Sequence, residues 1–230
     1  YAQEYFIADT SGKTSTTPTA HPAVFGVANV TDRTITNVTI RHLAFRGPSD
    51  ATFIAAGQIV GLTVTDCVFM SGRALLMAGM YRKGIFSHNR EHHDSDVFAA
   101  FVGSCATGTA DVEVSENTLT GKGFVHIHEG SANVRVVNNN ISCESTSKAD
   151  VAVSVRARGY GIQIVNNRIR FTRAAGTAIF VSEELSSGDG VIEGNVLTGG
   201  EAGLVDISVR ASNWAVKNNT YSGKVRIARP

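Results

Sequence analysis

One short phrase, of the form Val-X-Val-X-X-Asn-X-Ile, returns along most of this 230-residue chain. Its clearest copy occupies residues 134–141. The asparagines of five copies are separated by 22, 28, 28 and 24 residues, and they are Asn117, Asn139, Asn167, Asn195 and Asn219. A repeat period in the twenties is typical of a solenoid, in which similar coils stack along one axis.

The repeat continues upstream in weaker copies at 38–45, 62–69 and 84–89, where Cys67 occupies the asparagine position of its copy. From Ile35 onward, apolar and polar residues alternate over four to eight positions, which is the signal of a half-buried β-strand. No stretch has helical periodicity. A second set of strand-like segments lies about halfway between the phrases. The pattern therefore predicts an all-β chain with three short strands in each coil.

The recurring asparagine lies between the second and third strands of each predicted coil. Asparagine tolerates the left-handed αL conformation better than other residues with a side chain, so it suits a sharp bend there. Corresponding strands of successive coils are expected to pair in parallel, about 4.8 Å apart. Asparagines stacked at that spacing can hydrogen-bond along the axis. We therefore predict an asparagine ladder at the second turn.

The repeated phrase resembles that of the right-handed parallel β-helix superfamily, the pectate-lyase-like proteins. This group includes pectate lyases, polygalacturonases, alginate lyases and epimerases, and phage tailspike depolymerases. The resemblance covers residues 35 to 225 and implies a single-stranded right-handed parallel β-helix of about eight coils of 22–28 residues. Residues 1–34 are expected to be an irregular segment or a partial first coil, and 35–230 the β-helix domain. Neither end shows a capping element, which predicts a longer chain, a homotrimer, or another domain covering the ends.

Composition narrows the range of partners. A formal charge of +1 with 7% aromatic residues argues against nucleic acid. The sequence contains no run of eighteen apolar residues, so a membrane span is not expected. The first residues have neither the basic nor the apolar region of a signal peptide, so any such peptide has been removed or lies outside this sequence. The three cysteines, scattered at Cys67, Cys105 and Cys143, do not form a disulfide framework. The superfamily implies an extracellular, cell-surface or virion location.

In β-helix enzymes of this superfamily, the substrate cleft runs along the outer face of the first strand of each coil. In this chain those strands are the halfway segments, whose alternation predicts three outward rows. The first row is His126, Ser154, Phe180 and Asp206; the second is His128, Arg156, Ser182 and Ser208; the third is Gly130, Arg158, Glu184 and Arg210.

These rows suggest chemistry on an acidic polysaccharide. Arg156 is suited to neutralise a uronate carboxylate, and His126 or His128 to transfer a proton near neutral pH. Phe180 is suited to stack on a sugar ring, and Asp206 to orient it. Arg158 and Glu184 are further candidates for substrate binding, although with Arg210 they also fit a surface row of ion pairs. Polar side chains are in any case the rule on an exposed strand face.

A second candidate site is the segment 89–96, the densest charged and imidazole-rich stretch of the chain. We predict a loop there that projects beside the same outer face. His92, His93, Asp94 and Asp96 carry metal-binding or acid–base side chains. Neighbouring histidines on an extended chain point in different directions, so a solvated turn is an equal alternative. No cofactor and no metal site are expected, while binding of a divalent cation such as calcium stays open.

The sequence lacks the readable catalytic signatures of the named subfamilies. It has neither the Arg-X-Pro-X-X-Arg of calcium pectate lyases nor the Gly-His-Gly of polygalacturonases. Our first hypothesis is a carbohydrate-active β-helix that cleaves a polysaccharide by lyase or hydrolase chemistry. The alternative is a non-catalytic glycan-binding, adhesin or tailspike shaft segment, and a polysaccharide epimerase is a third possibility.

Overall fold

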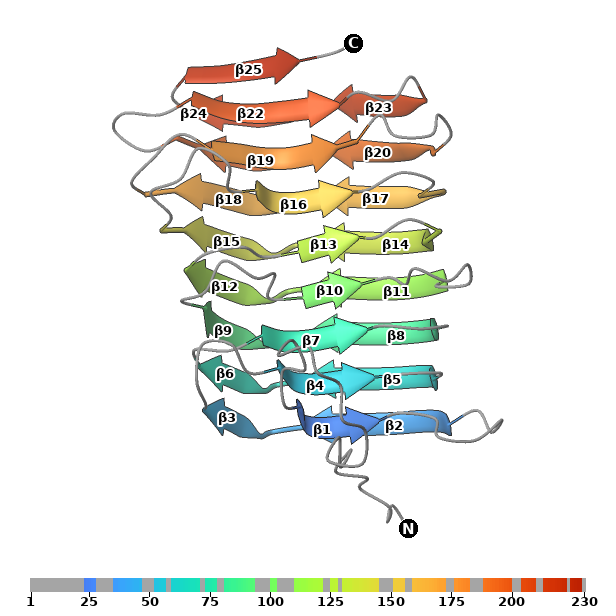
Figure 1. Ribbon diagram of the computed structural model, residues 1–230. Coiled ribbons are helices and arrows are strands. Elements are labelled where there is room, and N and C mark those ends of the chain that lie inside the picture. Colours follow the sequence, from blue (N-terminus) through green and yellow to red (C-terminus); the bar gives the residue numbers. More distant parts are fainter. Residues whose placement is uncertain are drawn as a thin grey trace, which may run out of the picture.

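The described residues of the computed structural model form coils that stack along one axis, and their strands make three parallel β-sheets that run along this axis (Figure 1). The described ranges are 23–27, 35–46, 52–56, 59–70, 73–77, 81–93, 100–102, 110–121, 125–127, 130–144, 151–155, 159–172, 176–182, 188–199, 204–209, 213–222 and 224–228. In each sheet, neighbouring strands come from successive coils. The predicted all-β parallel β-helix is therefore confirmed.

We name the sheets A, B and C in the order in which each coil visits them. Sheet A has nine strands: β1 (Ala23–Val27), β4 (Thr52–Ala56), β7 (Arg73–Met77), β10 (Ala100–Val102), β13 (Val125–Ile127), β16 (Val151–Val155), β19 (Gly176–Val181), β22 (Leu204–Val209) and β25 (Lys224–Ala228). Seven of these are the predicted halfway segments, and the structure adds β1 before residue 35 and β25 after the last copy of the phrase. Because β1 pairs in parallel with β4, the segment 1–34 contributes a strand to the β-helix.

Sheets B and C contain the repeated phrase, one on each side of its asparagine. Sheet B has eight strands: β2 (Ile35–Arg41), β5 (Ile59–Thr65), β8 (Tyr81–Ser87), β11 (Ala110–Ser115), β14 (Ala132–Val137), β17 (Ile162–Val165), β20 (Gly190–Glu193) and β23 (Trp214–Lys217). Sheet C also has eight: β3 (Ala44–Arg46), β6 (Val68–Met70), β9 (Arg90–His93), β12 (Thr118–Gly121), β15 (Asn140–Cys143), β18 (Arg168–Phe171), β21 (Val196–Thr198) and β24 (Thr220–Ser222).

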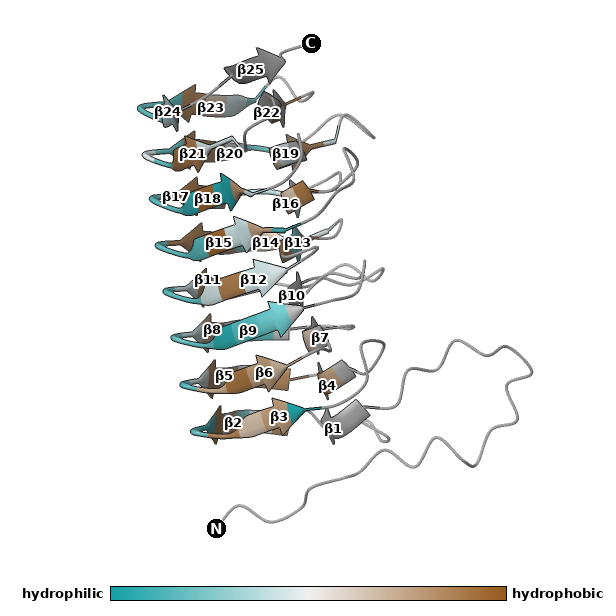
Figure 2. Ribbon diagram, turned by 90° about the vertical axis from the view of Figure 1, so that its left-hand side faces the viewer, coloured by the Kyte–Doolittle hydropathy of each residue, from teal (hydrophilic) through white to brown (hydrophobic). Residues whose placement is uncertain are grey.

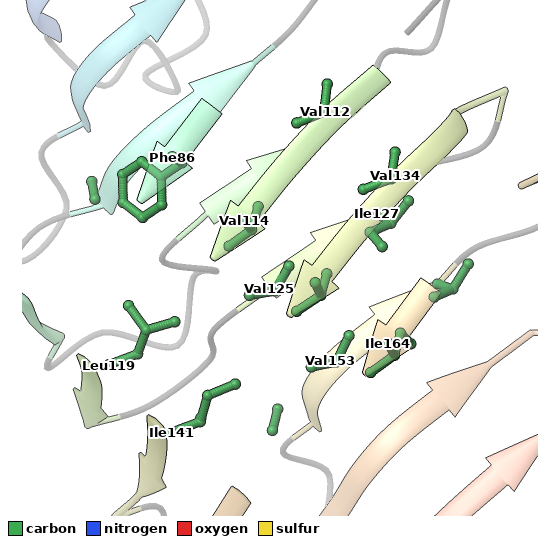
Figure 3. Close-up of a cluster of buried hydrophobic side chains, with 14 of the residues drawn as sticks. Phe86, Val112, Val114, Leu119, Val125, Ile127, Val134, Ile141, Val153 and Ile164 are labelled. Carbon is green, nitrogen blue, oxygen red and sulfur yellow. The ribbon is translucent and has the colours of Figure 1, made fainter. Parts of the chain in front are cut away.

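The core is built from inward rows contributed by all three sheets. Figure 3 shows Leu119 and Ile141 from sheet C meeting Val114, Val134 and Val153 from the other two sheets. All five side chains are buried. Full burial of such a side chain contributes about 1.5–3 kcal/mol. Stacking identical positions of successive coils thus gives a continuous apolar interior that needs no helix.

The predicted asparagine ladder is present and runs through buried positions. The Asn139 backbone N–H donates to Oδ1 of Asn167 at 2.9 Å, and the Asn139 side-chain amide donates to the same oxygen at 3.0 Å. The Asn139 amide also donates to the Val114 carbonyl at 2.8 Å, in the preceding coil. The same backbone-to-side-chain bond links each of Cys67, Asn89, Asn117, Asn139, Asn167 and Asn195 to the asparagine of the following coil.

The expected αL conformation of the recurring asparagines is wrong. The residue immediately before each of them adopts it, with φ of 57° at Asn138, 56° at Asn166 and 65° at Gly194. At that position the side chain points toward solvent, where asparagine, aspartate, histidine and glycine are all found. The recurring asparagine instead turns its amide into the bend, because its hydrogen bonds along the axis require it there. Among the described residues, no helix has the length and apolar character needed to cross a membrane.

Replacing one ladder asparagine should destabilise the fold. In Asn167→Ala, the backbone N–H and side-chain amide of Asn139 lose their common acceptor inside a buried network. Buried donors left without partners cost about 1–3 kcal/mol each, so we expect the free energy of unfolding to fall by about 2–4 kcal/mol in urea titrations. The neighbouring Asn166→Gly is the matched control, because glycine accepts a positive φ. Equal stability of the two variants would contradict the role given to the ladder.

Candidate functional site

The first predicted row forms on the outer face of sheet A, with one change of register. His126 pairs with Ser154, and Ser154 pairs with Phe180. The next partner is Ser208, whereas Asp206 pairs with Thr177. The predicted placement of Asp206 beside Phe180 is therefore wrong. Val181 pairs with Val209 and Gly190 with Trp214, so the turn from sheet A to sheet B is shorter in the later coil, and spacing counted from the following strand does not reveal this.

The outer side chains of sheet A are less accessible than we expected. His126 is only 4% exposed and Ser154 6%, and the outward Ala152 and Ala178 are fully buried. Phe180 is half-buried. The described part of this face is therefore shielded from solvent around His126. Six of the predicted site residues lie outside the described residues: His128, Arg156, Arg158, Glu184, Asp94 and Asp96. For His93 and Asp206 the structure describes the strand but not the side chain.

The predicted loop at 89–96 is wrong at its beginning. Asn89 belongs to the asparagine ladder, and Arg90–His93 forms strand β9 between β6 and β12 of sheet C. Its alternation follows from this pairing: Arg90 and His92 lie on the outer face, and Glu91 points inward. His92 Nδ1 lies 3.0 Å from Oγ1 of Thr120 on the neighbouring strand. A strongly charged sequence is thus held in a strand by the coils on either side of it.

The outer face of sheet C is rich in arginine and contains no carboxylate among its described side chains. We call these residues the sheet C face: Ala44, Arg46, Val68, Met70, Arg90, His92, Thr118, Thr120, Asn140, Ser142, Arg168, Arg170, Val196, Thr198 and Thr220. All four arginines are exposed. No ion pair joins them to a described carboxylate. In Figure 2 the strands of sheet C lie one above another, with β9 in teal.

Three of the four arginines of the sheet C face lie at two stations, and Arg46 lies apart from them on β3. Arg90 and His92 lie on β9, and Arg168 and Arg170 on β18. Register pairing connects the two stations through Thr118 and Asn140 in one row, and through Thr120 and Ser142 in the other. The stations are three strand spacings apart, about 14 Å. Hydroxyl and amide groups therefore fill the surface between Arg90 at one station and Arg168 and Arg170 at the other.

Sheet B differs, because its outer face carries charges of both signs, and two of its carboxylates form ion pairs. Arg135 lies 2.7 Å from Glu113, and Lys217 lies 3.2 Å from Glu193, each pair spanning two adjacent strands. A hollow on this face is lined by Gln163, Asp189, Gly190, Glu193 and Ala215, among others. Since the carboxylate of Glu193 is already paired with Lys217, we assign no binding role to the hollow. Among the described outward side chains of the two sheets, those of sheet C include no carboxylate, whereas those of sheet B include Glu113 and Glu193.

Glu91 is a carboxyl group inside the apolar core. Its row partners are Phe69 on one side and Leu119 on the other, both fully buried. The Ala74 N–H donates to Glu91 Oε1 at 3.3 Å. Burial raises the pKa of Glu91 from 4.5 to about 8, and the Ala74 hydrogen bond only partly opposes this. The side chain is therefore protonated at neutral pH.

The sequence contained a signal for the sheet C face that we did not use. The residue after each recurring asparagine, and the one two positions further on, are the outward positions of sheet C. Taken coil by coil, these positions give the two rows that contain Arg90, His92, Arg168 and Arg170. Within the described ranges, no three histidine, cysteine, aspartate or glutamate side chains converge on a point where a metal ion could bind.

The chain matches no protein-family model, no curated protein and no solved structure. Function therefore has to be argued from the faces of the β-helix themselves.

Glu91 should make the stability of the fold depend on pH. Its pKa in the folded state, about 8, lies above the ordinary value of 4.5, so the folded protein binds more protons between these two values. Stability is then highest below about pH 4.5 and falls until about pH 8, by an amount on the order of a few kcal/mol from this group. Glu91→Gln should flatten this part of the profile in urea titrations across pH, while Glu113→Gln should not. An unchanged slope in Glu91→Gln would contradict the assignment.

Proposed function

We propose that this β-helix binds an acidic polysaccharide lengthwise along the sheet C face. The observation that carries the proposal is an exposed set of four arginines with no carboxylate among the described side chains around them. Like charges held close together on a surface repel one another, and this cost is relieved when an anion binds. A polymer with regularly repeated anionic groups meets this requirement at both cationic stations.

The chemistry of the groups on this face suits a uronate or sulfated sugar. A guanidinium presents planar paired donors that match a carboxylate or sulfate. Arg168 and Arg170 lie two positions apart on one strand, about 7 Å along the chain direction. Between the stations, Thr118, Thr120, Asn140 and Ser142 offer hydroxyl and amide groups to sugar hydroxyls. Such a ligand would use every polar position from β9 to β18.

Nucleic acid is also a polyanion, but the sheet C face suits it less well. Binding of single strands depends on aromatic side chains on which the bases stack. Among the described side chains of this face there is no phenylalanine, tyrosine or tryptophan. The proposal therefore favours a sugar polymer, and it places the protein among the carbohydrate-active β-helices of pectate-lyase-like type.

The proposal predicts that binding depends on the arginines of one sheet. The double variant Arg168→Gln, Arg170→Gln should bind polygalacturonate or dextran sulfate more weakly by at least about tenfold, since a factor of ten corresponds to about 1.4 kcal/mol. Added salt should weaken wild-type binding, because exposed charges are screened. The affinities can be measured by fluorescence anisotropy with labelled polymers.

Arg135→Gln is the matched control, because it removes an exposed arginine from sheet B. Its affinity should equal that of the wild type. Neutral dextran tests whether charge is needed at all, and labelled single-stranded DNA tests the alternative polyanion. Equal effects of the sheet B and sheet C variants, or tighter binding of DNA than of either acidic polysaccharide, would argue against the proposal.

A second candidate function is cleavage of the polysaccharide along sheet A by lyase or hydrolase chemistry. One observation favours it: register pairing brings His126, Ser154 and Phe180 into a single outward row on adjacent strands. In a lyase, a base removes the C5 proton of a uronate, the bond to the leaving oxygen breaks, and a double bond forms in the sugar. A hydrolase instead adds water across the glycosidic bond.

Product analysis separates these chemistries from simple binding. If sheet A is catalytic, incubation with polygalacturonate should release either unsaturated uronates, detected by ultraviolet absorbance, or reducing ends without them. His128→Ala and Arg156→Ala should then abolish turnover while binding to the sheet C face persists. Unchanged turnover in both variants would remove sheet A as the active site, and the absence of any product would leave binding as the proposed function.

A further inference from the structure

Strand β9 connects the core to the proposed binding face. Its alternation places Arg90 and His92 on the sheet C face and the carboxyl group of Glu91 in the interior, one residue away from each. The two neighbouring strands contribute Phe69 and Leu119 to the same inward row. Elsewhere this row is apolar or aromatic, being completed by Phe45, Ile141, Ile169, Leu197 and Tyr221.

The ionisable groups near Glu91 can be named for the described side chains of the elements that pack against it. Strands β6 and β12 carry no ionisable side chain. Cys67 precedes β6, and its thiol is buried. Burial also raises the pKa of this thiol. Arg90 and His92 point outward from β9 itself, and Ala74 of β7 contributes its backbone N–H. The side chains of Arg73 on β7 and His93 on β9 lie outside the described residues.

We propose that Glu91 is a pH-sensitive latch for the sheet C face, so that loss of its proton releases a bound polyanion. This inference rests on the proposed function, since it concerns regulation of the same face. While Glu91 is neutral, β9 stays packed between its neighbours and holds Arg90 and His92 at the first cationic station. The sequence places the latch in the strand that carries that station, and β18 has Ile169 at the equivalent inward position.

Two physical effects of ionisation act in the same direction. A carboxylate enclosed by Phe69 and Leu119 is poorly solvated, and displacement of β9 toward water relieves this cost. Displacement of the strand removes Arg90 and His92 from alignment with the arginines of β18. In addition, a negative charge one residue from Arg90 and His92 offsets the positive potential that attracts the polymer. Both effects weaken binding of a polyanion as the pH rises.

The experiment measures binding of labelled polygalacturonate at constant ionic strength from pH 7 to pH 9, above the range in which histidine ordinarily changes charge. If only the form with neutral Glu91 binds, about one molecule in eleven is competent one pH unit above a pKa of about 8. The apparent Kd of the wild type should then rise about tenfold between pH 7 and pH 9. Glu91→Gln keeps the shape of the side chain without its ionisation, and its Kd should stay within about twofold. Glu113→Gln, on sheet B, should follow the wild type.

A ligand-free measurement tests the latch separately from the proposed function. Hydrogen exchange of the amides of β9, corrected for intrinsic rates, should show opening at pH 9 in the wild type and not in Glu91→Gln. His92→Gln should retain this opening, because the latch is Glu91. Opening of β9 without polymer binding at any pH would overturn the proposed function and the release of a polyanion together. The latch alone would be overturned if Glu91→Gln lost affinity with rising pH as the wild type does. Equal hydrogen exchange of β9 in the wild type and Glu91→Gln at pH 9 would also overturn it.

Discussion

The hydrogen bonds of the asparagine ladder are the constraint on which the other features of this molecule depend. Each ladder oxygen accepts from the backbone of the preceding coil, so it fixes where every coil turns from sheet B to sheet C. An amide is required because one group has to donate and accept at once. Once the turn is fixed, the positions after it alternate outward and inward in every coil. Side chains separated by more than twenty residues then stand in straight rows.

This arrangement explains why the three faces of one repeated sequence differ so much. Inward positions are constrained by packing, since each side chain contacts its counterparts in the coils on either side. Outward positions are not constrained in this way, and the three sheets differ in the charge and burial of their outward side chains. Sheet B pairs opposite charges across strands, as Arg135 and Glu113 do. Sheet A buries His126 and Ser154 in its described part, and sheet C exposes arginines without carboxylates. The repeat therefore specifies the scaffold, and departures from it distinguish the surfaces.

The same distinction explains how far the sequence alone could predict the structure. The three sheets and the asparagine ladder follow from rules that recur in every coil, so copies of the phrase reinforce one another. The αL residue was misplaced because asparagine suits both the αL position and the buried ladder position. The sequence Asn138–Asn139 does not show which of the two amides is buried. Asp206 was misplaced because the turn from β22 to β23 is shorter than the turn from β19 to β20, and a count back from the following strand assumes equal turns. The charged segment after Asn89 was assigned to a loop because local composition opposes a strand, whereas pairing with β6 and β12 imposes one.

Strand β9 shows what such a conflict between local and global preferences signifies. The local sequence of β9, an arginine, a glutamate and two histidines, does not favour a strand by itself. An inward glutamate also makes the fold less stable than a leucine at the same position would. Leu119 and Ile141 occupy the equivalent inward position in the next two coils, so the fold accommodates an apolar residue there. Positions that break a rule the rest of the chain obeys tend to be functional or strained. Glu91 is the one inward carboxyl of this row, and the residues on either side of it, Arg90 and His92, are the ones that we propose to bind an anion. The stability lost by burying Glu91 is therefore associated with the binding face on the other side of the same strand.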